Sequence, residues 1–151
     1  MKQLTIIITI LLISFGTKAQ NVEKETAAIK AVLTDFFETF THPDMKYFDR
    51  NCSPDFQLLE VGEVWERKEI QAYVDRVTAK PLTFERTNQF DFIKVKFYKN
   101  IAWVNYHNTA TIRSLQDNSI KKREWLESII LEKVKGKWVL QQMHSSVKKT
   151  Q

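Results

Sequence analysis

The chain has 151 residues, a formal net charge of +5, one cysteine and three glycines. This length fits one domain, and a content of 43% hydrophobic and 12% aromatic residues excludes a wholly disordered protein. Gly16, Gly62 and Gly136 lie too far apart for a dinucleotide fingerprint or a P-loop, and a single cysteine excludes a disulfide framework and a cysteine-type zinc site.

The first 19 residues have the order of parts of a secretory signal peptide. Lys2 gives a positive start, residues 6–15 are almost all apolar, and Ala19 is a small residue ahead of a possible cut before Gln20. The alternative is a membrane anchor, but a spanning helix needs about 20 apolar residues, roughly twice this run. We therefore expect cleavage near Ala19, an exported (periplasmic or secreted) protein without a stable membrane anchor, and a domain over residues 20–151.

The remaining charge and the cysteine suggest no special partner. Loss of Lys2 and Lys18 leaves 21 basic and 18 acidic residues, a net charge of +3. The basic residues fall near presumed strand ends rather than in a stripe, so no nucleic-acid partner is expected. Cys52 could be a reactive thiol or an intermolecular link, but a buried, small apolar role is favoured.

Helices are predicted in the first half of the chain. Between residues 22 and 40, apolar side chains recur at spacings of three and four, which indicates an amphipathic helix. His42-Pro43 ends it, because the residue before proline avoids the helical region. Asp44 caps a second, short helix. After a short strand over residues 56–61 and a turn at Gly62, a third helix is predicted over residues 66–78.

Beyond Pro81 the hydrophobic period changes to two, which is typical of strands. Breaks at Lys99-Asn100, near Asp117-Asn118 and at Lys135-Gly136 are plausible hairpin turns. They predict four long strands near residues 83–98, 101–115, 119–134 and 137–147. Three helices followed by an antiparallel meander is an α+β pattern. We expect the helices to pack in the concave face of the curved sheet, which encloses a cavity.

If each hairpin loop has two residues, the register follows from the turns. Asp91 then pairs with Asn108, Asn108 with Glu127, and Glu127 with His144, as a polar row on the mostly apolar face. On this register Tyr106 and Trp125 lie in the flanking rows. A one-residue slip in any hairpin would move a whole strand's side chains to the other face.

The polar row has two interpretations. In the first, Glu127 and His144 satisfy each other in a structural network that Asn108 and Asp91 complete. In the second, the row lines a ligand pocket, because a few polar groups in an apolar concavity are the usual pocket pattern. A carboxylate beside an imidazole could also transfer protons. The pocket is favoured. The three histidines do not converge, so no metal or cofactor is expected.

The opposite face of the sheet mixes lysines with large apolar side chains. Its predicted members include Phe90, Phe92, Trp103, Leu126 and Ile130. Scattered surface hydrophobic residues are common, but so many on one face favour a homodimer interface slightly.

The order of elements resembles the nuclear transport factor 2-like superfamily, which includes ketosteroid-isomerase-like and polyketide-cyclase-like domains. The segments that carry the resemblance are Trp125-Leu126-Glu127-Ser128, Gly136-Lys137-Trp138 and Met143-His144-Ser145-Ser146. The resemblance covers residues 22–147. It implies a cone-shaped, cystatin-like roll, a cavity closed by the helices, and frequent dimerisation through the outer face of the sheet.

We therefore predict an exported domain that binds a small, largely apolar molecule and is a homodimer. Asn108, Glu127 and His144 would orient the polar end of the ligand. The other expected binding residues are Asp91, Tyr106, Trp125, Trp65 and Tyr73. One alternative is a lyase-, isomerase- or hydrolase-type enzyme that uses Glu127 and His144 as an acid–base pair. The other is a non-catalytic, dimeric interaction module.

Overall fold

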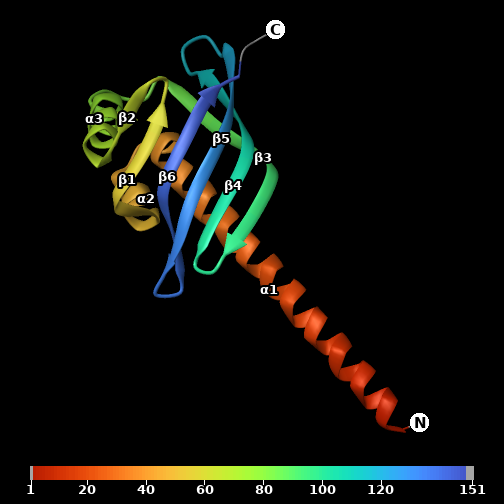
Figure 1. Cartoon of the computed structure of the whole chain (residues 1–151). Helices are drawn as coiled ribbons and strands as arrows, with labels where there is room; N and C mark the ends of the chain where they lie inside the picture. Colours follow the sequence, from red (N-terminus) through yellow and green to blue (C-terminus); the bar gives the residue numbers. More distant parts are fainter. Residues whose placement is uncertain (1, 149–151) are drawn as a thin grey trace.

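The computed structural model describes residues 2–148, with side chains over residues 20–148. Figure 1 shows a curved sheet whose concave face is crossed by the first helix, with a second layer of short elements at one end. The elements are α1 (Lys2–Thr41), α2 (Met45–Asn51), β1 (Cys52–Glu60), β2 (Glu63–Trp65), α3 (Arg67–Thr78), β3 (Phe84–Tyr98), β4 (Ile101–Ser114), β5 (Ile120–Val134) and β6 (Lys137–Val147).

The six strands form one sheet in the order β2-β1-β6-β5-β4-β3. All neighbours are antiparallel except β1 and β6, which run parallel. The α+β class and the three helices are confirmed. The short strand β2 was not predicted, and β1 begins at Cys52 rather than at residue 56, so that Pro54 lies within the strand.

The helical core follows from the aromatic spacing of α1. Phe36, Phe37 and Phe40 are buried, and the Phe36 ring meets those of Phe48 in α2 and Phe56 in β1 at 6.4 and 5.5 Å between centroids. Asp44 accepts a hydrogen bond from the backbone N–H of Lys46 at 2.9 Å and so caps α2, as predicted. Aromatic contacts thus fix α1 against the shorter elements.

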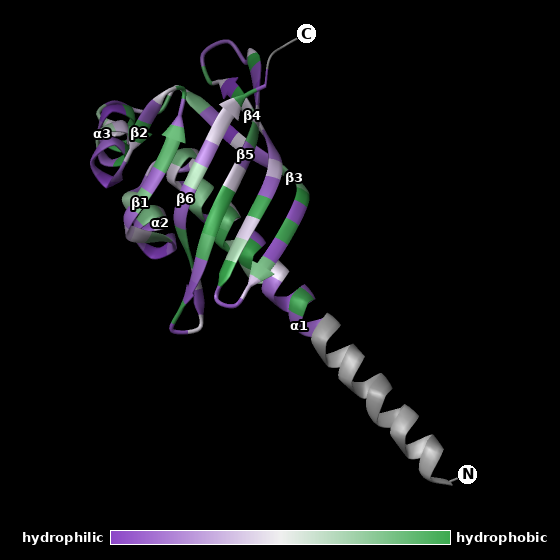
Figure 2. Cartoon of the chain, viewed as in Figure 1, coloured by the Kyte–Doolittle hydropathy of each residue, from purple (hydrophilic) through white to green (hydrophobic). Residues whose placement is uncertain are grey.

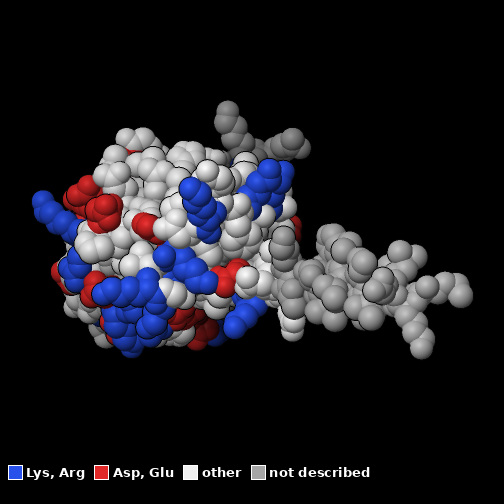
Figure 3. Space-filling view, turned by 60° about the horizontal axis from the view of Figure 1, so that its bottom comes forward, with Lys and Arg blue, Asp and Glu red and all other residues white. Residues whose placement is uncertain are grey.

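Hydrophobic and hydrophilic residues alternate along the long strands, as Figure 2 shows. The apolar residues of this alternation face α1, as expected for an antiparallel sheet with one covered face. On the face that Figure 3 presents, lysine and arginine side chains lie among aspartate and glutamate. Among the described residues, no helix is long and apolar enough to cross a membrane. The side chains of the predicted signal peptide lie outside those described, so cleavage stays a prediction.

Two of the three predicted turns are confirmed. Tyr98 pairs with Ile101, and Val134 pairs with Lys137, so both hairpins have two-residue loops. Gly136 has φ +83°, a backbone conformation that glycine adopts without strain. The turn near Asp117 is longer than predicted, because β4 ends at Ser114 and β5 begins at Ile120.

The longer loop shifts the β4–β5 register by two residues. Asn108 therefore lies opposite Trp125, and Glu127 lies opposite Tyr106, so the predicted Asn108–Glu127 pair is wrong. A shift of two keeps every side chain on its predicted face. Glu127 and Asn108 are both buried on the concave side and remain diagonal neighbours.

A β-bulge at Ile93 makes the register of β3 differ from the predicted one. The pairing is as predicted from the turn to Lys94, but Phe92 lies opposite Tyr106, which leaves Ile93 as an extra residue. For the residues of β3 that precede Ile93, each side chain therefore lies on the face opposite to the predicted one. Asp91 lies opposite His107 and is exposed rather than in the polar row, while Phe90 packs against the core. The prediction that Phe90 and Phe92 lie on the outer face is wrong for the same reason.

A second β-bulge, in β6, makes the pairing of β5 with β6 differ from the predicted register. Leu131 lies opposite Leu140, but Ile130 lies opposite Gln142, so Gln141 is the extra residue. Ser145 is consequently the partner of Glu127, and it is 4% exposed. His144 is exposed on the outer face opposite Ser128. The predicted Glu127–His144 pair is therefore wrong, and Met143 is in the core rather than on the outer face.

Candidate functional site

A cavity of about 430 Å³ opens between the concave face of the sheet and the layer formed by α1, the β1–β2 hairpin and α3. Its volume is within the range of small-molecule sites. The lining side chains are those of Phe37, Phe40, Leu58, Glu60, Val61, Glu63, Trp65, Tyr73, Phe84, Arg86, Asn108, Ile112, Arg123, Trp125, Glu127, Met143 and Ser145.

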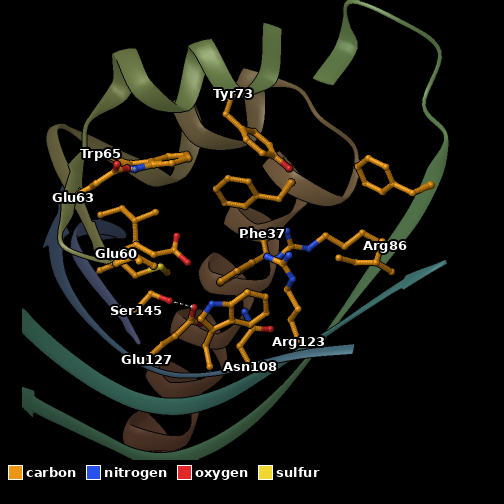
Figure 4. A pocket seen from close by; sticks show the side chains of 17 residues that line it. Phe37, Glu60, Glu63, Trp65, Tyr73, Arg86, Asn108, Arg123, Glu127 and Ser145 are labelled. Atoms are coloured by element: carbon orange, nitrogen blue, oxygen red, sulfur yellow. Dashed lines mark hydrogen bonds between the residues drawn. The ribbon is translucent and has the colours of Figure 1, made fainter. Parts of the chain in front are cut away.

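Aromatic side chains form the wall opposite the sheet. The Tyr73 ring of α3 meets Phe40 of α1 at 5.5 Å and Trp65 of β2 at 6.3 Å between centroids. Figure 4 shows Trp65 and Tyr73 on the side of the cavity away from the strands. The capping box between Glu66 and Glu69 fixes the start of α3 and so the position of this wall. The wall offers a flat, mostly apolar surface.

The floor of the cavity carries a buried carboxyl group, that of Glu127. The Ser145 hydroxyl donates a hydrogen bond to Glu127 Oε1 at 2.9 Å. Asn108 Oδ1 accepts a hydrogen bond from Asn88 Nδ2 at 2.8 Å. Among residues 20–148, no partner is within hydrogen-bond geometry of Glu127 Oε2, Asn108 Nδ2, Trp125 Nε1 or the Tyr106 hydroxyl.

These four polar atoms belong to side chains that are at most 8% exposed. A buried polar group without a partner costs about 1–3 kcal/mol, and native structures hold few such groups. Glu127, Asn108 and Trp125 line the cavity, and Tyr106 lies beside Glu127 in the sheet. Tyr106 and Asn108 are near enough to Glu127, and Trp125 to Glu60, to favour the charged carboxylates, but the geometry of these contacts leaves room for a better partner in the cavity.

Burial raises the pKa of Glu127 from 4.5 to about 7. The side chains of Ser145, Tyr106 and Asn108 oppose the rise, and the nearby charge of Glu60 adds to it. The pKa of Glu60 is raised as well, chiefly by burial, against the opposing effects of Trp125 and two arginines. Near neutral pH, Glu127 therefore exists in both protonation states and can donate or accept a proton.

Two arginines reach into the cavity from the sheet. Arg86 Nε donates a hydrogen bond to Asn88 Oδ1 at 3.0 Å. The guanidinium of Arg86 lies 5.7 Å from the ring of Phe40 and 5.9 Å from that of Trp125. Burial lowers the pKa of Arg86, which nonetheless stays charged at neutral pH. In Figure 4 the side chains of Arg86 and Arg123 point toward the same part of the cavity.

The structure brings together most of the predicted binding residues. Five of them line the cavity: Trp65, Tyr73, Asn108, Trp125 and Glu127. Tyr106 is buried in the sheet beside Glu127. Asp91 and His144 lie on the outer face and do not reach the cavity. Of the predicted acid–base pair, only Glu127 is in place.

Sequence reasoning missed Arg86, Arg123, Glu60 and Ser145. Arg123 lies two residues before Trp125 and four before Glu127 in β5. Since alternate residues of a strand share a face, this spacing alone assigns Arg123 to the concave face. Arg86 and Ser145 lie beyond the two bulges, which reverse the faces inferred from the turns. Among residues 20–148, no cluster of His, Cys, Asp and Glu could hold a metal ion.

The family profile of the SnoaL-like domain matches residues 29–149, most of the chain. The chain belongs to the SnoaL-like domain family. This family is part of the nuclear transport factor 2-like superfamily, so the predicted resemblance is confirmed. No curated protein matches this SnoaL-like chain.

Solved structures similar to this SnoaL-like domain have diverse descriptions. A ketosteroid isomerase-like protein from Erwinia carotovora atroseptica has a TM-score of 0.62 and 17% identity, over 82% of this chain and 96% of that one. A type 2 hexachlorocyclohexane dehydrochlorinase has a TM-score of 0.70 and 10% identity, over 87% and 90%. The CamKII hub homology domain of Chlamydomonas reinhardtii has a TM-score of 0.68 and 19% identity, over 83% and 99%. At these identities the likeness concerns the fold alone.

Proposed function

We propose that this SnoaL-like domain binds a small, largely apolar molecule in the cavity. The aromatic wall, with Trp65 and Tyr73, contacts the body of the ligand. Its polar end meets Glu127, Asn108 and Trp125 at the floor. The observation that carries the proposal is that three cavity-lining side chains, those of Glu127, Asn108 and Trp125, each carry a buried polar atom without a partner of good hydrogen-bond geometry among residues 20–148.

The alternative of a purely structural network explains these groups less well. In such a network the polar side chains would satisfy each other, as Ser145 and Glu127 do through one carboxyl oxygen. The other oxygen of Glu127, the amide nitrogen of Asn108 and the indole N–H of Trp125 reach no partner with good hydrogen-bond geometry among residues 20–148, although Asn108 lies near Glu127 and Trp125 near Glu60. A ligand with a hydroxyl or carbonyl group would supply partners for them.

Proton transfer by Glu127 is a second candidate function. The specific observation in its favour is a carboxyl group with a pKa of about 7 that lines a cavity. Catalysis by a Glu127–His144 pair does not fit the fold, since His144 is on the other side of the sheet. Glu127 would act alone, with Tyr106 and Ser145 as positioning residues.

The proposal also includes the cellular location and the oligomeric state of the domain. Export after cleavage near Ala19 rests on the sequence of residues 1–19. Homodimerisation through the outer face of the sheet rests on three exposed side chains, those of Trp103, Leu126 and Ile130. The similarity to a hub homology domain is in keeping with assembly of this fold.

Titration with the neutral fluorescent probe N-phenyl-1-naphthylamine tests ligand binding. We expect a saturable rise in probe fluorescence, and a loss of affinity of about tenfold or more when Ile112→Trp fills the cavity. Leu115→Trp adds the same side chain at an exposed position in the β4–β5 loop and serves as the control. Equal binding by both variants would show that the probe does not occupy the cavity.

The proton-transfer candidate is tested with Glu127→Gln on any compound that the protein turns over. The amide keeps the size of the side chain but has no titrating proton. Turnover should be lost while affinity is largely kept. Unchanged turnover would remove Glu127 from the chemistry and leave the binding proposal intact.

A further inference from the structure

The two arginines of the cavity lack the acidic partners that three of the exposed arginines have. Arg50, Arg67 and Arg113 are exposed and each pairs with a carboxylate. Arg86 and Arg123 form no ion pair within residues 20–148, although their side chains point toward the same part of the cavity in Figure 4. Two like charges brought together in a partly buried place repel each other unless an anion lies between them.

The carboxyl groups of the cavity do not cancel this charge. Glu60, Glu63 and Glu127 line the same space, but within residues 20–148 none of them makes an ion pair with a guanidinium. Burial favours the neutral form of the Glu60 and Glu127 carboxyl groups, whereas arginine stays charged throughout the physiological range. The two guanidinium groups are therefore left without a carboxylate paired to them at their end of the cavity.

One of the two arginines, Arg86, is held in place for a ligand rather than free to move away. Arg86 is fixed by its hydrogen bond to Asn88 and by the rings of Phe40 and Trp125. Its planar fork can donate two parallel hydrogen bonds to one oxyanion. Ala110 lies between Asn88 and Arg123 in the sheet, and its small side chain leaves space above the strands.

The distance between the charged end and the floor sets the length of the ligand. Arg123, Trp125 and Glu127 alternate along one face of β5. Four residues of a strand span about 13 Å. Arg123 is exposed, Arg86 is half-buried and Glu127 is 5% exposed, so Arg123 lies at the mouth and the carboxyl group at the inner end.

We propose that the ligand of this domain is an amphipathic organic anion. Its carboxylate or other oxyanion group binds Arg86 and Arg123 near the mouth, its apolar body lies along the aromatic wall, and its inner end reaches Glu127. This inference rests on the proposed function and adds the chemical class of the ligand and two residues that determine specificity.

Two fluorescent probes that differ only in one anionic group distinguish the contribution of ligand charge to affinity from that of the apolar rings. 8-Anilino-1-naphthalenesulfonate has the ring system of N-phenyl-1-naphthylamine and carries one sulfonate in addition. We expect the wild-type protein to bind the sulfonate at least about tenfold more tightly than the neutral probe, as befits a charge-assisted pair. The Arg86→Met/Arg123→Met double variant should lose that preference and bind the neutral probe within about threefold of the wild type.

Arg113→Met is the control for the kind of substitution, because it removes one positive charge from an exposed arginine of β4 that pairs with Glu85. It should leave the binding of both probes unchanged. Neutral-probe binding also reports that the double variant is folded. If the wild type binds both probes equally, or if Arg113→Met weakens the sulfonate as much as the double variant does, the anion proposal is overturned while ligand binding stands. If neither probe binds the wild type, the proposed function fails as well.

Discussion

At the scale of single residues, Glu127 combines two features that are rarely found together in a core. Its side chain is 5% exposed and lines the cavity, yet one carboxyl oxygen has no partner of good hydrogen-bond geometry among the described residues. Burial penalises the charged form, so the carboxyl group retains its proton to about pH 7. The same property that costs stability makes the group available for hydrogen bonding or proton exchange with a ligand.

The pH dependence of stability should reveal this carboxyl group. Its pKa is about 4.5 in the unfolded chain and about 7 in the fold. The folded state therefore loses stability as the pH rises through about 7, and below about 4.5 the effect vanishes because both states are protonated. Relative to Glu127→Gln, the wild type should lose about 3 kcal/mol of unfolding free energy between these limits. Urea unfolding across this range provides the measurement, and parallel pH profiles of the two proteins would contradict the assignment.

At the scale of elements, two β-bulges decide which side chains enter the cavity. Hydrophobic period and turn residues predict the helices, the long strands and the two hairpins, because these signals are local. A bulge inserts one residue without a strong sequence mark, and every side chain beyond it changes face. This is why Glu127 could be placed from its own strand, whereas Asp91 and His144 were assigned to the wrong face and Arg86 was missed.

The bulge in β6 determines which residue of that strand affects the pKa of Glu127. The hydroxyl of Ser145 donates a hydrogen bond that favours the charged carboxylate. Ser145→Ala should therefore raise the pKa of Glu127 further above 7. His144→Ala, one residue earlier and on the outer face, should leave that pKa unchanged. The pKa of Glu127 in each variant is measured by carbon-13 NMR of the carboxyl group. A response to His144→Ala with none to Ser145→Ala would mean that the register of β6 lacks the bulge.

The bulge in β3 makes a corresponding prediction for packing. Phe90 meets the rings of Phe37 at 4.9 Å and Tyr106 at 5.8 Å, whereas Ile93 is 54% exposed. Phe90→Ala should cost about 2–4 kcal/mol of unfolding free energy, and Ile93→Ala at most about 0.5 kcal/mol. Chemical denaturation of both variants checks this order. A larger loss of stability for Ile93→Ala than for Phe90→Ala would contradict the bulge, because Ile93 faces the core only in the register without it.

At the scale of the whole molecule, the sheet has one covered and one open face. The concave face holds α1 and the cavity, and the outer face exposes Trp103, Leu126 and Ile130 at 38–45% of their surface. Trp103 and Ile130 are direct neighbours on β4 and β5. Apolar side chains gathered on one face of a sheet are well suited to contact a second copy of the chain.

Sedimentation velocity at micromolar concentration tests the dimer. The wild type should sediment as a dimer, and Trp103→Glu should be monomeric, because a charge would be buried without a partner at the interface. Val64→Glu introduces the same charge on β2, at a side chain that is 52% exposed, and should leave the dimer intact. A monomeric wild type would contradict the proposed interface without affecting the cavity.

The most direct test of the account is the titration of the Glu127 carboxyl group with and without a ligand, followed by carbon-13 NMR and assigned by the signal that Glu127→Gln removes. For the free protein we predict a midpoint near pH 7, and a clear displacement of that midpoint when N-phenyl-1-naphthylamine saturates the cavity. A midpoint near 4.5 that the probe leaves unchanged would contradict both the buried carboxyl group and its contact with a bound molecule.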